Sequence, residues 1–427
     1  MIAWELPDLP DLPGSGPVPT VVDSARGRVQ LTPGPLARMY VCGITPYDAT
    51  HLGHAATYVT FDVLNRALRD AGHDVVYVQN VTDVDDPLLA RAERDGVDWR
   101  DLAARETQLF RDDMAALRVI PPDHYIGVVE SLPMIEAEVS ELLARGLAYR
   151  LPLPDDEAAG DGAREDVYLD LAQQPDFGST SCWDHAAMDE VFADRGGDPQ
   201  RAGKRSRFDP LLWRAARPGE PSWPSADLGE GRPGWHIECT AIALEYLGMG
   251  FDVQGGGTDL IFPHHEMSAV QASALTDRRP FADAFVHQAM VGYEGAKMSK
   301  SRGNLVLVSA LRADGVDPMA IRLALLDHHH GTDWEWTDAD LVTGKERLER
   351  WRAATSRDAG PPAQDTLDAV RAALADDLDT PAALAAIDAW VTQALQESPS
   401  GPEQRGEPDS PALVARLADS LLGVRLR

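Results

Sequence analysis

The sequence predicts an α/β protein in which strands and helices alternate to form a parallel sheet, followed by a helical domain. Strand-like segments at 38–41 and 75–79 flank a helical segment at 57–71, the strand–helix–strand pattern of a parallel sheet. From Asp317 onward the chain is rich in alanine and leucine with helical spacing. A length of 427 residues exceeds a usual single domain, so we expect a catalytic domain with an appended helical domain.

The order of segments along the chain predicts where these domains begin and end. We expect a lead-in at 1–34, rich in proline and glycine, a catalytic domain at 35–310 with an insertion at about 120–230, and a helical domain at 311–427. Helical spacing predicts these helices: 100–118, 128–148, 317–330, 338–356, 364–377, 381–396 and 411–423. Polar composition predicts a loop at 154–166 and a flexible linker at 398–409.

The charge of the chain bears on its partners. It carries 39 basic and 69 acidic residues, a formal charge of −30. Nucleic-acid binders gain affinity from Lys and Arg that neutralise phosphates, so this charge disfavours tRNA and favours a small acceptor. Solubility alone is the commonest cause of an acidic surface, and local basic patches are compatible with the total.

The amino terminus and the cysteines indicate the compartment. The first twenty residues are proline-rich with Asp8 and Asp11, and no apolar run reaches membrane-spanning length. We therefore expect a cytoplasmic protein, monomeric and without a membrane partner. Cys42, Cys182 and Cys239 are too few and too scattered for a disulfide framework, which favours metal binding or catalysis. Cys182 has no motif around it and is interpreted as structural.

Two distant motifs together suggest nucleotide chemistry. His51 and His54 belong to an HLGH segment at a predicted strand-to-helix junction, where a helix N-terminus favours anions and glycine admits a phosphate or base. Lys297 and Lys300 belong to a KMSKS segment and would meet the far end of a polyphosphate as point charges. Each motif alone is more often structural or a solvated loop.

Six motifs occur in the order of one known family. They are HLGH at 51–54, YVQNVTDVDD at 77–86, DRGGDP at 194–199, GRPGWHIEC at 231–239, GGGTDLIFPHHE at 255–266 and KMSKS at 297–301. With them the chain resembles the class I aminoacyl-tRNA synthetases, and within these the cysteinyl group and its relatives, the mycothiol-pathway ligases. The resemblance covers roughly 35–395. It implies a Rossmann-type catalytic domain of the class I synthetases with an insertion and a C-terminal helical bundle.

The resemblance implies one zinc ion per chain. In the cysteinyl family the residues matching Cys42, Cys239 and His264 converge on zinc, although their spacing alone would not nominate them. The family members that charge tRNA add a glutamate where this chain has Ser268. We therefore expect three protein ligands and an open fourth position, which a substrate cysteine thiolate fills better than a serine hydroxyl.

The resemblance also implies an aminoacyl-adenylate pocket, with ATP and Mg²⁺ as substrate. His51 and His54 would donate to the phosphates, and Lys297 and Lys300 would hold the departing pyrophosphate. Asp259 would accept hydrogen bonds from the ribose hydroxyls. The other expected pocket residues surround the same crevice at the strand ends: Cys42, Gly43, Ile44, Thr45, Thr57, Asn80, Val81, Thr82, Trp235, Gly257, Thr258 and Val291.

Several departures from a cysteinyl-tRNA synthetase favour the ligase. Only about thirty residues follow Ala394, too few for an anticodon-contacting domain, and Ala56 stands where the tRNA enzymes usually carry arginine. The acidic charge and Ser268 point the same way. The implied activity is formation of cysteinyl-adenylate and transfer of cysteine to the amine of glucosaminyl-inositol. A cysteinyl-tRNA synthetase and a non-catalytic zinc-binding paralogue stay open as alternatives. Sugar contacts would come from the polar rim around 80–86 or from the loop at 194–199, but no single residue is assigned to the sugar or as the base for the amine.

Overall fold

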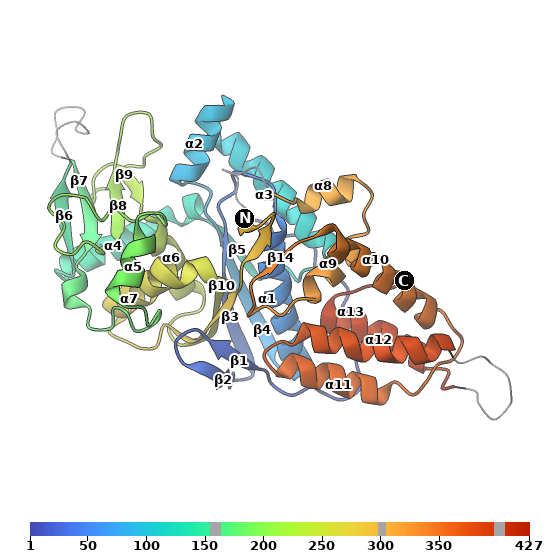
Figure 1. The fold of residues 1–427 in the computed structure, drawn as a ribbon. Helices are drawn as coiled ribbons and strands as arrows, with labels where there is room; N and C mark the ends of the chain where they lie inside the picture. The colour runs from blue at the N-terminus through green and yellow to red at the C-terminus, as the bar shows by residue number, and fades with distance from the viewer. Residues whose placement is uncertain (154–163, 298–304, 397–405) are drawn as a thin grey trace.

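A computed structural model describes residues 1–153, 164–297, 305–396 and 406–427. At the centre of these residues lies a five-stranded sheet with the strand order β11-β10-β3-β4-β5 (Figure 1). Its strands are β3 (Leu36–Ile44), β4 (Asp74–Val81), β5 (His124–Gly127), β10 (Phe251–Gly257) and β11 (Ala282–Gln288). The strands expected at 38–41 and 75–79 lie within β3 and β4, so the α/β prediction is confirmed.

The strand order reverses between β3 and β10. From β3 the chain moves outward through β4 to β5, and it later returns to the other side of β3 as β10 and β11. All four pairings are parallel, so the carboxyl ends of the strands meet at one edge of the sheet. In open α/β sheets, ligands bind in the crevice at such a reversal.

Helices connect the first strands. They are α1 (Leu52–Asp70), α2 (Asp86–Asp95), α3 (Trp99–Ala116) and α4 (Val128–Ala144). The helix expected at 57–71 begins at Leu52, because the His51 side chain caps it in place of the usual Ser, Thr, Asp or Asn. The sequence interpretation missed α2, whose boundaries are marked by the N-cap Asp85 and by Gly96 with a φ of 66°.

The insertion forms a separate antiparallel sheet. Its strands are β6 (Ala148–Pro152), β7 (Glu165–Leu169), β8 (Leu211–Ala215) and β9 (Gly231–Pro233), with η1 (Leu171–Gln173) and α5 (His185–Phe192) between them. β5 lies inside the range 120–230 but pairs with β4, so this sheet begins at Ala148 and not at about 120. The helix expected to reach 148 ends at Ala144, since Gly146 turns the chain with a φ of 69°. Most of the loop expected at 154–166 lies outside the described residues.

The second half of the catalytic domain returns to the parallel sheet. It contains α6 (Trp235–Tyr246), η2 (Thr258–Leu260), η3 (Ile261–His265) and α7 (Glu266–Thr276). A small sheet follows, made of β12 (Val291–Tyr293), β13 (Ala296–Lys297) and β14 (Trp334–Glu335).

The C-terminal part is helical, as expected. It comprises α8 (Val308–Ala313), α9 (Pro318–Leu326), α10 (Asp338–Thr355), α11 (Gln364–Ala375), α12 (Thr380–Gln396) and α13 (Ser410–Leu422). The helix expected at 317–330 ends at Leu326, because the chain turns there to add β14 beside β12. Most of the linker expected at 398–409 lies outside the described residues.

The helical part packs against α1 of the catalytic domain (Figure 1). A buried ionic cluster joins them: Asp62 of α1 pairs with Arg66, at 2.7 Å, and with Arg322 of α9. In the lead-in, β1 (Thr20–Asp23) and β2 (Gly27–Gln30) form a hairpin, and Thr20 O accepts a hydrogen bond from Asp377 N. Among the described residues, no helix combines the length and apolar character needed to cross a membrane.

Candidate active site

The ends of β3 and β4 are locked together at the carboxyl edge of the sheet. The Asn80 side chain accepts a hydrogen bond from Gly43 N at 2.7 Å and donates one to Thr82 Oγ1 at 3.1 Å. A Cβ atom on Gly43 would lie 1.6 Å from Asn80 O, so this position accommodates glycine only. The structure therefore brings together the predicted segments around Gly43 and Asn80, including Ile44 and Val81, which are paired.

His51 and His54 lie together at the N-terminus of α1. His51 Nδ1 accepts hydrogen bonds from Gly53 N at 3.1 Å and His54 N at 3.4 Å, and the two imidazole rings stack with 3.8 Å between centroids. Since Nδ1 of His51 is an acceptor, its ring proton resides on Nε2, where it is a donor. A donor ring at a helix N-terminus suits an anionic group. Thr57 lies one turn further along α1, with Oγ1 bonded to Gly53 O at 3.2 Å.

Both flanks of the KMSKS segment are anchored near this helix end. On one side, Lys297 pairs through its backbone with Gly292 in the small sheet. On the other side, Leu52 N donates to Val306 O at 2.9 Å and Val308 N donates to Thr50 O at 3.0 Å. Residues 298–304, including Lys300, lie outside the described part of the chain, as does the side chain of Lys297.

Cys42, Cys239 and His264 converge although they come from three elements. Cys42 is near the end of β3, Cys239 lies in α6 and His264 in η3, and their ligand atoms all lie within 4.8 Å of one another. All three side chains are buried. Burial raises the pKa of the Cys42 thiol, and the neighbouring Cys239 raises it further. Burial also opposes ionisation of Cys239, but hydrogen bonding from Cys42 and the charge of His264 lower its pKa. Two cysteine sulfurs and one imidazole nitrogen are a donor set that fits a soft metal cation.

Polar side chains that the sequence interpretation did not single out surround this cluster. His236 Nδ1 lies 3.0 Å from His264 Nδ1, and His265 Nε2 lies 3.2 Å from Cys42 Sγ. Gln254 Nε2 donates to Cys42 Sγ at 3.4 Å. His236 and His265 lie inside the motifs GRPGWHIEC and GGGTDLIFPHHE, which were their available sequence signal. Ser268 donates to His236 O at 3.4 Å and is not part of the three-residue group.

The remaining predicted residues divide between the crevice and the core. Gly257 ends β10 and is followed by Thr258 and Asp259 in η2, at the switch-point edge. A Cβ atom on Gly257 would lie 2.6 Å from Asp259 Oδ1, so the turn brings this carboxylate back over the glycine. Val291 begins β12 and is buried as part of the main hydrophobic core.

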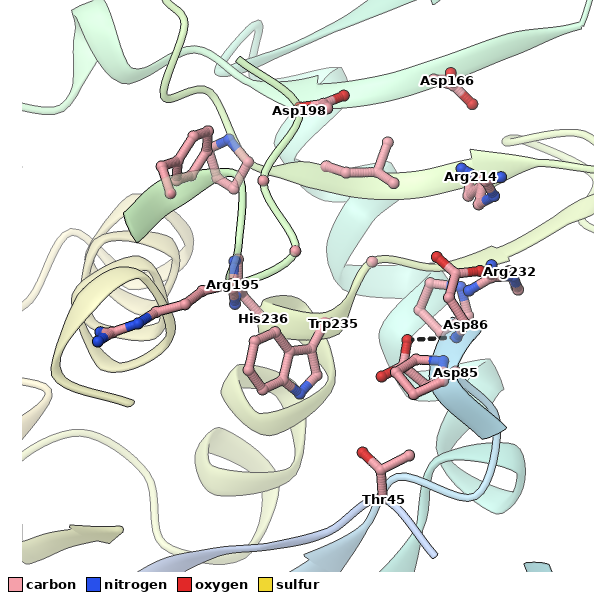
Figure 2. Close-up of a pocket in the computed structure, with 18 of the residues that line it drawn as sticks. Thr45, Asp85, Asp86, Asp166, Arg195, Asp198, Arg214, Arg232, Trp235 and His236 are labelled. Carbon is pink, nitrogen blue, oxygen red and sulfur yellow. Dashed lines mark hydrogen bonds and ion pairs between the residues drawn. The ribbon is translucent and has the colours of Figure 1, made fainter. Parts of the chain in front are cut away.

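A cavity of about 660 Å³ opens beside the three-residue cluster, between the parallel sheet and the insertion (Figure 2). Thr45, Asp259 and Trp235 line it. Trp235 is the first residue of α6, and its ring lies 4.4 Å from that of His264 at 31°. Figure 2 shows Trp235 between Thr45, the loop that carries Arg195 and Asp198, and the start of α2. A volume of this size is ordinary for a small-molecule site.

Comparison with known proteins assigns the family. Residues 29–346 match the model of the tRNA synthetases class I (C) catalytic domain. The chain is 60% identical to the L-cysteine:1D-myo-inositol 2-amino-2-deoxy-alpha-D-glucopyranoside ligase of Geodermatophilus obscurus and 59% identical to that of Cellulomonas flavigena, over 100% of both chains in each case. The chain belongs to this ligase family. The ligase of Streptomyces griseus is 58% identical, again over both full lengths.

Solved structures agree on the fold of this ligase family member. The leucyl-tRNA synthetase of Agrobacterium radiobacter K84 superposes with a TM-score of 0.63 at 11% identity, covering 92% of this chain and 85% of that one. A Mycobacterium tuberculosis methionyl-tRNA synthetase bound to methionyl-adenylate gives a TM-score of 0.60 at 16% identity, covering 91% and 92%. The expected class I synthetase fold is therefore confirmed.

Proposed function

We propose that this chain is an ATP-dependent ligase that joins L-cysteine to the amine of 1D-myo-inositol 2-amino-2-deoxy-alpha-D-glucopyranoside, releasing AMP and diphosphate. The observation that carries the proposal is the buried Cys42–Cys239–His264 cluster at the switch-point crevice, beside a cavity large enough for a sugar. The full-length similarity to relatives that bear this name supports it.

Zinc is the metal that we propose for the cluster, held by Cys42, Cys239 and His264. Two adjacent buried thiols resist double ionisation without a cation, and a divalent ion removes that obstacle. Zinc, when bound, supplies a preference for thiolate sulfur over a hydroxyl, which would select cysteine over serine. Ser268 offers no carboxylate, so the protein contributes three donors among the described residues.

The first step that we propose is attack of a cysteine carboxylate oxygen on the α-phosphorus of ATP. The bond from the α-phosphorus to its bridging oxygen breaks, and diphosphate leaves with the electron pair. His51 Nε2–H and His54 at the start of α1 donate to the phosphates, and Lys297 and Lys300 hold the leaving diphosphate with Mg²⁺. Asp259 takes the ribose hydroxyls, while positioning of the two reactants supplies much of the rate.

The second step is attack of the acceptor amine nitrogen on the acyl carbon of the adenylate. The acceptor enters as an ammonium and gives one proton to solvent, so the nitrogen attacks as the neutral amine. The bond from the acyl carbon to the AMP oxygen then breaks, AMP leaves with the electron pair, and the nitrogen of the new amide loses its second proton to solvent. Thr45 and Trp235 line the cavity next to the metal cluster, so they wall the space where the two reactants meet.

A small acceptor fits this chain better than tRNA. The formal charge of −30 disfavours binding of a polyanion. A monomer in the cytoplasm accords with these small-molecule substrates, and both remain part of the proposal.

The test offers purified protein ATP, Mg²⁺ and cysteine with either the glucosaminyl-inositol or tRNA. We expect AMP release with amide formation in the sugar reaction only. Charging of tRNA without amide formation would mean that the acceptor is wrong. Absence of cysteine-dependent ATP–diphosphate exchange would mean that the chain is a non-catalytic relative.

A further inference from the structure

The cavity beside the metal cluster is built from two parts of the chain that are distant in sequence. The start of α2 contributes Asp85 and Asp86 to one wall, and the insertion contributes β8, β9 and the loop with Arg195 and Asp198 (Figure 2). We propose that this cavity is the acceptor subsite, and that the Asp85 carboxylate holds the ammonium group of the amino sugar. The assignment rests on the proposed function and adds the residue that recognises the amine.

The arginines of the cavity are already engaged. Arg217 binds both oxygens of Asp166, at 2.6 and 2.9 Å, and Arg214 pairs with Glu220 at 3.0 Å. Arg232 pairs with Asp86 and with Glu220, the latter at 3.3 Å. Arg195 donates to the backbone carbonyls of Asp259 and Phe262, and Arg201 lies 3.6 Å from Asp166. Because these ion pairs and hydrogen bonds hold the arginines in place, the cavity is lined by polar groups in fixed positions. Such a lining suits a ligand rich in hydroxyls.

The carboxylates differ in how well they are satisfied. Asp198 pairs with Lys204 at 2.6 Å and accepts a hydrogen bond from the Tyr168 hydroxyl. Asp194 is exposed to solvent, which screens its charge. Among the described residues the Asp85 carboxylate forms no ion pair, and the one hydrogen bond that it accepts is from Asp86 N at 2.8 Å. Asp85 is therefore a largely enclosed carboxylate that lacks a cation.

The surroundings of Asp85 destabilise its ionised carboxylate. Burial raises its pKa to about 6, and the charge of Asp86 adds to the effect, while the bond from Asp86 N and the charges of Arg232 and His264 lower it. A ligand ammonium against the carboxylate would stabilise the ionised form and remove this penalty. Since Asp85 lines the same cavity as Trp235, whose ring lies 4.4 Å from that of His264, the held amine would be near the Cys42–Cys239–His264 cluster, where the acyl group is made.

Trp235 completes the subsite. Its ring is half-buried, with one side against the His264 imidazole and the rest bordering the cavity. An aromatic face packs well against the apolar face of a sugar ring. The cavity therefore offers an anionic group, fixed polar groups and an aromatic wall, which is the chemistry of a polyhydroxylated amine.

The experiment compares wild type with Asp85→Asn, which keeps the oxygen that caps α2 but loses the charge. We expect cysteine-dependent ATP–diphosphate exchange to stay within about two-fold of wild type, while KM for the amino sugar in amide formation rises roughly 10- to 100-fold. The matched control is Asp98→Asn, which changes the N-cap aspartate of α3 outside the cavity and should leave both values unchanged.

A second ligand separates charge recognition from simple packing. An analogue with a hydroxyl in place of the amine is used as a competitive inhibitor. Wild type should bind the amine roughly ten-fold or more tightly than the analogue, and Asp85→Asn should bind the two nearly equally. If the variant loses exchange as well, the preference of wild type for the amine over the analogue decides the question.

Each outcome has one meaning. If wild type forms no amide, the proposed function fails. If wild type forms it and Asp85→Asn keeps the same KM, or if the variant weakens both ligands equally, the assignment of Asp85 is overturned while the function stands. Equal binding of amine and analogue by wild type also overturns the assignment.

Discussion

Two enclosed aspartates of this molecule, Asp62 and Asp85, differ in whether cationic side chains of the protein neutralise their charge. Between α1 and the helical domain, Asp62 meets Arg66 and Arg322, and Ile120 N also donates to it at 2.7 Å. Burial alone would raise the pKa of Asp62, but the two arginines lower it below its ordinary value. In the cavity, burial raises the pKa of Asp85 to about 6, because no cation among the described residues pairs with it. A cluster whose charges are paired within the protein holds elements together, whereas an enclosed carboxylate without an ion pair is suited to binding a cationic ligand.

The largest effect expected from the difference between Asp62 and Asp85 is on the stability of the Asp62→Asn variant. Asp62→Asn leaves two buried arginines without their counter-charge, so we expect the free energy of unfolding to fall by about 3–5 kcal/mol. Urea unfolding followed by tryptophan fluorescence measures it, with the exposed Asp98→Asn variant as control. A loss below about 1 kcal/mol would show that the cluster does not hold the two domains together.

The metal cluster is expected to show a large effect on activity with a smaller one on folding. Cys239→Ser removes one of three donors, so bound zinc should fall well below one per chain, and cysteine-dependent exchange should drop more than about 100-fold. Metal analysis and the exchange assay measure the two quantities on the same preparation. Cys182→Ser is the matched control, because Cys182 is exposed and is not part of the three-residue group. Full zinc content in the Cys239 variant would contradict the ligand assignment.

In contrast to Asp62→Asn, which is expected to destabilise the protein, Asp85→Asn is expected to stabilise it. Since the folded-state pKa of Asp85 is raised, the native state loses stability as pH rises from about 4 to above 6, through ionisation of this group. Removing the charge should therefore raise the free energy of unfolding at pH 8 by about 1 kcal/mol, with little change at pH 4. Denaturant unfolding at both pH values tests this, and a clear destabilisation at pH 8 would mean that Asp85 has a cation partner in the native protein.

The smallest effect is expected at Ser268. Its hydrogen bond to His236 O is long, at 3.4 Å, so Ser268→Ala should change stability by less than about 1 kcal/mol and leave zinc content intact. Zinc loss in this variant would instead make Ser268 part of the metal site.

The sequence predicted the parts of the site that carry their own signature. HLGH at a strand-to-helix junction, the three candidate metal donors and the strand-end segments at Gly43 and Asn80 lie at the carboxyl edge of the sheet. The position expected for Val291 near the adenine stays a prediction; in the structure its side chain is part of the hydrophobic core. A small apolar residue at the start of a strand carries no pattern that separates a ligand contact from core packing.

The sequence indicated 80–86 and 194–199 as possible sources of sugar contacts, but it could not show that both segments line one cavity or which side chains face it. Asp85 and Arg232 are separated by more than a hundred positions, and only the packing of the insertion sheet over α2 brings them to one wall. The polar helix α2 was missed, because its apolar positions are few and its caps give the main signal. His236 and His265 likewise become neighbours of the metal donors only through the fold.

The most direct test of the central claim replaces zinc by cobalt and follows the visible spectrum as cysteine is added. A cluster of two thiolates and one imidazole with room for a substrate thiol predicts a sulfur-to-cobalt absorption that strengthens with cysteine, saturates at one equivalent per chain and does not respond to serine. A spectrum unchanged by cysteine, or equally changed by serine, would contradict the claim that this cluster selects the substrate.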